Sequence, residues 1–136
     1  MGLLAVELFL TATGDILVNE VAPRPHNSGH VTLETSYTDQ FEQHIRAILD
    51  LPLGNPENKV SGVMVNLVGA EKHTGAVYYE HMNSILKMSG VIPHIYGKKE
   101  TRPFRKMGHI TIIHPKIDTA RKMAKHVKET LSVISK

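Results

Sequence analysis

Two apolar segments near the start of the chain, residues 3–10 and 16–21, are separated by the turn-forming sequence Thr-Ala-Thr-Gly-Asp. Both segments are rich in residues that favour strands, and this arrangement predicts a β-hairpin. A loop of two or four residues centred on Thr13 and Gly14 would pair Glu7 directly with Glu20, whereas a loop of three or five residues would break that pairing. The placement of two carboxylates therefore depends on one turn.

Opposed glutamates on neighbouring strands create an electrostatic problem. Side chains that face each other in an antiparallel pair have Cβ atoms roughly 4.5–5.5 Å apart, and like charges at that distance are destabilising. A bound cation removes the repulsion, and Mg²⁺ suits a site made of carboxylate oxygens and substrate phosphate oxygens. Glu7 and Glu20 are therefore predicted metal ligands. The alternative is that one of them points to solvent and the hairpin holds no ligand.

The segment after the second strand, residues 19–30, is polar and interrupted by two prolines. It reads Asn-Glu-Val-Ala-Pro-Arg-Pro-His-Asn-Ser-Gly-His, and so combines a carboxylate, a guanidinium, two imidazoles, two carboxamides and a hydroxyl. The prolines restrict φ and the glycine permits unusual backbone angles, so the segment can hold these groups in a fixed arrangement. This pattern predicts a binding loop.

The chain resembles a known family in residues 5–9, 14–30, 40–44, 46–49, 63–67, 95–98, 102–103 and 105–110, with the most specific match in residues 19–30. The family comprises the 5-(carboxyamino)imidazole ribonucleotide synthetases, the ATPase subunits of phosphoribosylaminoimidazole carboxylase in purine biosynthesis. The resemblance implies an α+β fold, in which the C-terminal part of an ATP-grasp domain precedes a small β-rich lobe (a rudimentary hybrid motif) and a C-terminal helix.

Enzymes of this family use ATP to activate bicarbonate and carboxylate the exocyclic amine of 5-aminoimidazole ribonucleotide. By resemblance, Glu7 and Glu20 hold the Mg²⁺ that bridges the phosphates of ATP. Arg24 and His26 are the expected catalytic residues, and the planar guanidinium of Arg24 is suited to orient bicarbonate or carboxyphosphate. His26 and Asn27 are expected near bicarbonate and the aminoimidazole.

The sequence does not fix a third protein ligand of the metal. In many ATP-grasp enzymes an asparagine two residues after the second glutamate also binds metal, but Ala22 occupies that position here. Asn19 or a water molecule is therefore expected to complete the site for the metal and its nucleotide.

A second group of charges lies in residues 98–106, where five cations surround a proline. The resemblance assigns the 5′-phosphate of the ribonucleotide to a lysine and an arginine of this loop, and Lys98, Arg105 and Lys106 are the best matches. Two alternatives are a solvated basic loop and a nucleic-acid patch. Because Phe104 is the only aromatic residue in the run, a stacking platform for single strands is disfavoured.

Composition excludes several function classes. The formal net charge of +3 fits acidic small molecules but is too small to require a nucleic-acid partner. The absence of cysteine excludes disulfides, thiolate catalysis and cysteine zinc sites, and the nine histidines are too scattered to favour a zinc site. No apolar stretch approaches the roughly 20 residues needed to cross a bilayer, and the start of the chain lacks the basic residues of a signal peptide. We therefore expect a cytoplasmic protein without membrane contact.

The remaining sequence is expected to form the scaffold, divided into residues 1–55 and 56–136 by a segment rich in Pro, Gly and Asn at 51–59. Asp39 and Glu42 resemble a capping box that opens a helix to about residue 49, and this helix is expected to back the binding loop. Further strands are predicted at residues 61–68, 91–96 and 107–113, and helices at residues 77–88 and from 118 to the end.

No glycine-rich phosphate loop is present, and the family's N-terminal ATP-binding part has no counterpart in the sequence. The chain is thus expected to be a C-terminal fragment, inactive alone, that requires the missing N-terminal part and belongs to a homodimer by resemblance. The enzyme fragment is favoured over a non-catalytic phosphate-binding module and a nucleic-acid binder. Within the first class, formate-dependent glycinamide ribonucleotide transformylase is the alternative, because it shares the Glu and Pro-Arg-Pro-His pattern.

Overall fold

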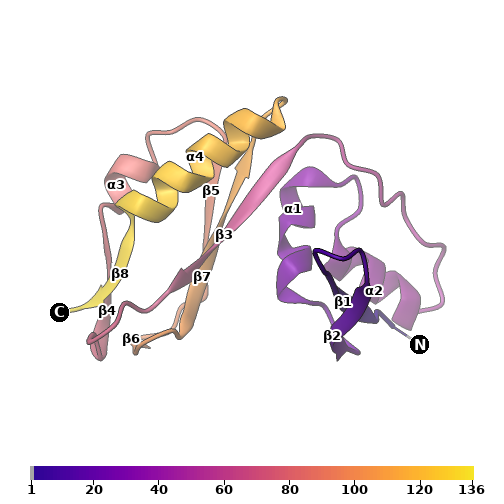
Figure 1. The fold of residues 1–136 in the computed structure, drawn as a ribbon, viewed down its shortest axis with the longest axis horizontal. Helices are drawn as coiled ribbons and strands as arrows, with labels where there is room; N and C mark the ends of the chain where they lie inside the picture. The colour runs from indigo at the N-terminus through magenta and orange to yellow at the C-terminus, as the bar shows by residue number, and fades with distance from the viewer. Residues whose placement is uncertain (1) are drawn as a thin grey trace. The chain divides into compact units, whose positions relative to one another are not determined.

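The computed structural model describes residues 2–136, which form two compact units divided between Lys59 and Val60 (Figure 1). The division lies inside the segment rich in Pro, Gly and Asn, a few residues after the expected boundary at residue 55. Helices and strands occur in both units, and the predicted α+β class is confirmed. No helix among the described residues is both long enough and apolar enough to span a bilayer.

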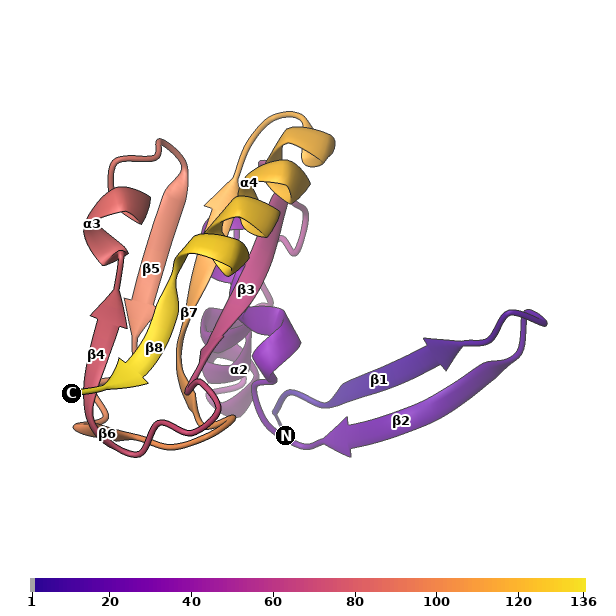
Figure 2. The ribbon, with the colours of Figure 1, turned by 60° about the vertical axis from the view of Figure 1, so that its left-hand side comes forward.

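The first unit begins with an antiparallel hairpin of β1 (Ala5–Leu10) and β2 (Ile16–Ala22), which lie side by side in Figure 2. Leu10 pairs with Ile16, so the loop between the strands has five residues, a length that was expected to separate the two glutamates. The register nevertheless shifts between Glu7 and Leu8, where β2 accommodates one additional residue, Asn19. This β-bulge returns Glu7 to a position opposite Glu20. The predicted pairing is confirmed, but the predicted loop length is wrong.

Three short helical segments follow the hairpin: a 3₁₀ helix η1 (Asn27–Val31), α1 (Thr32–Thr35) and α2 (Gln40–Ile48). The helix predicted from Asp39 is confirmed as α2, because the Asp39 side chain accepts hydrogen bonds from the backbone N–H groups of Phe41 and Glu42. Glu42 itself pairs with Arg46 one turn later. Ile45 and Ile48, on the apolar face of α2, are about half exposed.

The second unit contains two three-stranded antiparallel sheets. One has the order β3 (Gly62–Val68), β7 (Lys106–Ile113), β5 (Val91–Ile95). The other has the order β6 (Glu100–Thr101), β4 (Gly75–Glu80), β8 (Ser132–Ser135). The three strands predicted at residues 61–68, 91–96 and 107–113 are confirmed.

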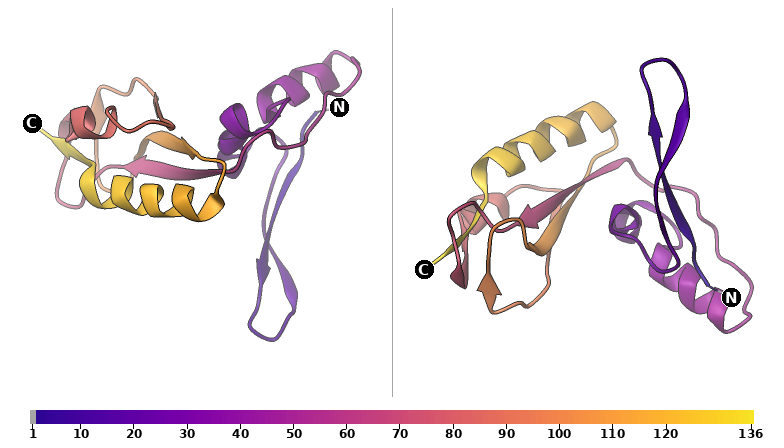
Figure 3. Two further views of the ribbon diagram at one scale, coloured as in Figure 1. Left: turned by 90° about the horizontal axis from the view of Figure 1, so that it is seen from above. Right: turned by 60° about the horizontal axis from the view of Figure 1, so that its bottom comes forward.

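Helix α4 (Ile117–Thr130) packs on β3 and β7, as Figure 3 shows from two directions. The core of this unit lies between the helix and the sheet, where Ile110, Ile112, Ala120 and Val127 are fully buried. The apolar residues of α4 recur at helical spacing, and for that reason the helix could be predicted from the sequence.

Two helix predictions in this unit are wrong in part. The helix expected at residues 77–88 is the strand β4 followed by the single turn α3 (Met82–Ile85). In β4 the side chains of Val77 and Tyr79 face the core while Ala76 and Tyr78 are exposed, which is the period of a strand. The helix expected to continue to the end stops at Thr130, because the last residues form β8 and pair with β4.

Candidate functional site

Three potential metal ligands meet at the base of the hairpin. The ligand atoms of Glu7, Glu20 and His26 all lie within 4.8 Å of one another. Glu7 is partly buried, the side chain of Glu20 is 54% exposed and His26 is buried. The two carboxylates offer the oxygen ligands that Mg²⁺ prefers, so they fit the predicted metal, whereas the imidazole nitrogen of His26 contacts Glu20.

Asn19 is brought to this cluster by the bulge. Its side-chain amide donates a hydrogen bond to Oε1 of Glu7 at 2.5 Å, from the strand opposite Glu7. A bulge re-aims a side chain at the point where it interrupts the ladder. Asn19 therefore restrains the first carboxylate and partly offsets the repulsion between the two glutamates.

His26 is held at both nitrogens of its ring. Nε2 lies 2.6 Å from Oε1 of Glu20, and Nδ1 lies 2.8 Å from Oγ of Ser28. His26 also caps η1 and has extended backbone angles, which turn its ring back towards β2. The sequence did not predict that His26 would join the two glutamates. Two prolines lie between Glu20 and His26, so the number of residues between them does not determine how close they lie in space.

The backbone of His26 is fixed by a residue that sequence analysis did not single out. The side-chain amide of Gln40, the first residue of α2, forms hydrogen bonds with both the N–H and the carbonyl oxygen of His26. This contact agrees with the prediction that the helix backs the binding loop. Only the short Gln-Phe-Glu similarity pointed to this position.

Arg24 and Asn27, the other predicted residues of the loop, lie outside the three-residue cluster. Arg24 is exposed, and its guanidinium donates a hydrogen bond to the carbonyl oxygen of Pro25 at 3.0 Å. Asn27 is partly buried and opens η1.

The basic residues predicted to bind phosphate lie in the segment of the second unit that connects β5 to β7 and contains β6, with Lys106 as the first residue of β7. Lys98 donates a hydrogen bond to the carbonyl oxygen of Lys106 at 2.6 Å, and Arg105 donates one to the carbonyl oxygen of Glu100 at 3.0 Å. These bonds tie the two ends of the loop together, and they leave donors of each cationic group available for an anion.

Gly69 anchors this loop to the end of β3. Its N–H donates to the carbonyl oxygen of Arg105, and its own carbonyl oxygen accepts from the N–H of Phe104. A Cβ atom at Gly69 would lie 2.1 Å from the carbonyl oxygen of Arg102, so the approach of the two backbones requires glycine.

Aromatic and imidazole rings pack beneath the basic loop. The hydroxyl of Tyr96 lies 2.9 Å from Nδ1 of His109, and the ring of His109 stacks on that of His94 with 4.5 Å between centroids. Burial raises the pKa of the Tyr96 phenol, which keeps it neutral well above physiological pH. This packing gives Lys98, two residues after Tyr96, a rigid support.

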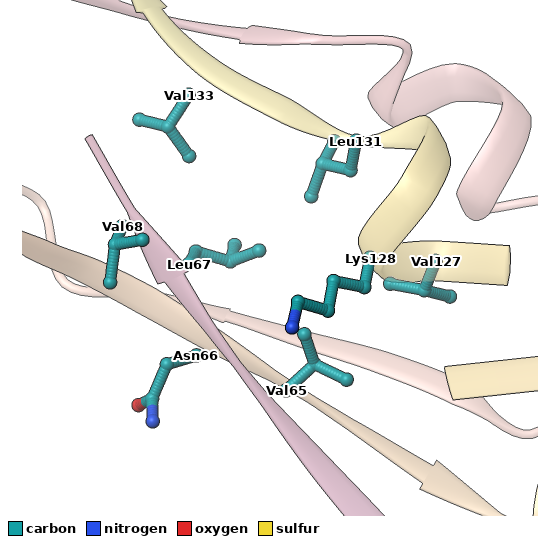
Figure 4. Close-up of a pocket in the computed structure, with 8 residues that line it drawn as sticks. All are labelled: Val65, Asn66, Leu67, Val68, Val127, Lys128, Leu131 and Val133. Carbon is teal, nitrogen blue, oxygen red and sulfur yellow. The ribbon is translucent and has the colours of Figure 1, made fainter. Parts of the chain in front are cut away.

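A pocket of about 180 Å³ lies elsewhere in the second unit, between β3 and the C-terminal end of α4 (Figure 4). Its wall is mainly aliphatic, and the side chain of Lys128 extends towards Val65. None of the predicted site residues lines it. The pocket therefore belongs to the packing of the helix on the sheet and not to the predicted site.

Two family models match the chain. Residues 1–41 match the ATP-grasp domain, and residues 62–123 match the phosphoribosylaminoimidazole carboxylase C-terminal domain. The first match contains the hairpin and the binding loop, and the second contains the basic loop.

Similar proteins belong to the same family. N5-carboxyaminoimidazole ribonucleotide synthase of Bacillus subtilis is 52% identical over 113 residues, which are 83% of this chain and 28% of the relative. Phosphoribosylaminoimidazole carboxylase of Vigna aconitifolia is 50% identical over 82% of this chain and 21% of its own length. The chain thus spans only about a quarter of these relatives.

Solved structures extend the similarity to the fold. N5-carboxyaminoimidazole ribonucleotide synthetase of Thermotoga maritima is 50% identical, with a TM-score of 0.95, over 99% of this chain and 38% of that structure. The Aspergillus clavatus enzyme, solved with ADP and 5-aminoimidazole ribonucleotide, is 32% identical, with a TM-score of 0.81, over 94% of this chain and 34% of that structure.

The role of Gly69 can be tested by hydrogen exchange. In Gly69→Ala the new methyl group forces the basic loop away, so we expect the amide of Phe104 to exchange about tenfold faster or more, since overpacking of this kind costs about 1–3 kcal/mol. The amide of Gln43, which donates to the carbonyl oxygen of Asp39 in the first unit, is the internal control and should exchange at the same rate in both proteins. Equal exchange at Phe104 in wild type and Gly69→Ala would contradict the anchoring role.

Proposed function

Because the chain belongs to the N5-carboxyaminoimidazole ribonucleotide synthetase family and corresponds to its C-terminal part, we propose that it completes an ATP-dependent ligase of purine biosynthesis. The reaction would convert 5-aminoimidazole ribonucleotide, bicarbonate and ATP into N5-carboxyaminoimidazole ribonucleotide, ADP and phosphate. The observation that carries this proposal is the convergence of Glu7, Glu20 and His26 on the bulged hairpin.

The two glutamates are proposed to hold Mg²⁺ for the nucleotide. A magnesium ion there would neutralise charge on the phosphates and align the transferred phosphoryl group with its acceptor. Glu7 presents its carboxylate in an orientation fixed by Asn19, and Glu20 is oriented by the imidazole of His26. The protein thus contributes prearranged ligands whose side chains are restrained before the nucleotide arrives.

The loop after β2 is proposed to bind the activated one-carbon unit. The guanidinium of Arg24 presents parallel donors to bicarbonate or carboxyphosphate, which are planar or tetrahedral oxyanions. His26 can hold or pass a proton beside Glu20, and Asn27 offers a donor and an acceptor to the aminoimidazole.

The basic loop is proposed to bind the 5′-phosphate of the ribonucleotide through Lys98, Arg105 and Lys106. Its hydrogen bonds and its anchorage at Gly69 hold three cationic side chains in one short segment. A dianionic phosphate suits such a segment better than a nucleic acid, because residues 98–106 form a short segment whose single aromatic residue is Phe104.

The first unit exposes an apolar surface that suits a missing partner. Val6, Leu8 and Phe9 of β1 and Leu17 and Val18 of β2 are all at least half exposed. Exposed apolar surface of this extent marks a place where another part of a protein packs. We propose that the N-terminal part of the ATP-grasp domain covers this apolar surface and that the chain is inactive without it. The complete enzyme is proposed to be a homodimer located in the cytoplasm.

Glu20→Gln tests the metal site in the complete enzyme. The substitution keeps the size of the side chain but removes the charge, so we expect kcat/KM for ATP to fall on the order of a hundredfold, with a higher requirement for Mg²⁺. Asp15→Asn is the matched control, because Asp15 is an exposed carboxylate in the loop of the same hairpin. A Glu20→Gln enzyme with wild-type magnesium dependence would refute the assignment.

Phosphate release tests the substrate. The complete enzyme should release phosphate from ATP when 5-aminoimidazole ribonucleotide and bicarbonate are present, and not when glycinamide ribonucleotide and formate replace them. The isolated chain should release none under either condition. Release with the glycinamide pair would favour the transformylase alternative, and a complete enzyme inactive with both pairs would favour a non-catalytic phosphate-binding module.

A further inference from the structure

We propose that Gln40 is a positioning residue that fixes the backbone of the binding loop and, through it, the imidazole of His26. No substrate needs to touch Gln40 for this role. The inference rests on the function proposed above, in which His26 acts beside the bound bicarbonate.

The amide of Gln40 uses its hydrogen-bonding capacity within the loop. Oε1 accepts from the N–H of His26 at 2.9 Å, and Nε2 donates to the carbonyl oxygen of His26 at 2.8 Å. Nε2 also lies 2.8 Å from Nδ1 of His30. An amide can accept at one end and donate twice at the other, whereas a carboxylate can only accept. Glutamine therefore matches the three loop groups, and glutamate does not.

The amide is enclosed as well as hydrogen bonded. Gln40 is 7% exposed and His26 is 8% exposed, so water does not compete freely for these bonds. A Cβ atom at Gly29 would lie 2.3 Å from Oε1 of Gln40, which shows how closely the loop wraps around the side chain. The backbone N–H of Gln40 donates to Thr32, which in turn donates to the carbonyl oxygen of Gly29.

These contacts connect α2 to the candidate metal ligands. The helix fixes Gln40, Gln40 fixes the backbone of His26, and the ring of His26 lies 2.6 Å from Glu20. A displacement of about 1 Å in a catalytic constellation can reduce the rate on the order of a hundredfold. A change at Gln40 should therefore act on the site although its side chain lies behind the loop.

Gln43 provides a matched control on the same helix. Its side chain makes the same pair of bonds, donating to the carbonyl oxygen of Gly54 at 2.7 Å and accepting from the N–H of Gly54 at 3.0 Å. The Gln43 contact lies in the segment that leads away from α2. Gln43→Glu removes the same donor and adds the same charge as Gln40→Glu, without touching the binding loop.

The test compares Gln40→Glu with Gln43→Glu in two measurements. The first is the position of the ring resonances of His26 in the isolated chain, which requires no activity. The second is the steady-state kinetics of the complete enzyme, with bicarbonate and ATP varied separately. We expect Gln40→Glu to shift the His26 resonances and to raise KM for bicarbonate about tenfold or more, and we expect KM for ATP to rise as well, because the ring of His26 contacts Glu20. Gln43→Glu should have none of these effects.

Unchanged His26 resonances in Gln40→Glu, or the same shifts in both variants, would overturn the positioning role. Shifted resonances with an unchanged KM for bicarbonate would overturn the link between that role and the substrate. If the wild-type complete enzyme shows no bicarbonate-dependent turnover, the proposed function fails, and the resonances alone then decide whether Gln40 positions His26.

Discussion

The repulsion between two carboxylates on neighbouring strands is the constraint around which the first unit is built. A β-bulge at Asn19 places Glu7 opposite Glu20, and the structure meets the resulting repulsion with a donor on each side. The amide of Asn19 bonds to Glu7, and the imidazole of His26 contacts Glu20. Such an arrangement of acidic groups is unfavourable for the hairpin alone, and the proposed divalent cation would remove the repulsion between them.

The supports of the two loops follow one pattern, since each polar loop is held through its backbone. Gln40 bonds to the backbone of His26, and Gly69 bonds to the backbone of Phe104 and Arg105. Backbone anchorage leaves functional side chains available for ligands. A close approach by glycine accompanies both loops, because Gly29 touches Gln40 and Gly69 touches the basic loop. Each loop is therefore preorganised by contacts with its own backbone.

Sequence periodicity was sufficient where one local rule decided the outcome. The hairpin and α2 followed from strand-forming residues and from the Asp39 cap. The bulge could not be predicted, because its position depends on which side chains find partners across the strands and not on the turn alone. Likewise the sequence predicts a helix where β4 forms, because a short apolar run fits the period of a helix as well as that of a strand. The pairing of β4 with β8, which decides for the strand, is not visible in the local sequence. The place of His26 beside Glu20 needed the folded loop.

Diffraction from crystals of the complete enzyme with a non-hydrolysable ATP analogue and Mn²⁺ tests the central claim most directly. Mn²⁺ replaces Mg²⁺ at oxygen sites and scatters anomalously, so its position is measured independently of the interpretation of the loop. The account predicts an anomalous peak bonded to the carboxylates of both Glu7 and Glu20 and to the phosphates of the nucleotide. A nucleotide-bound ion coordinated elsewhere, with these two carboxylates free of metal, would contradict it.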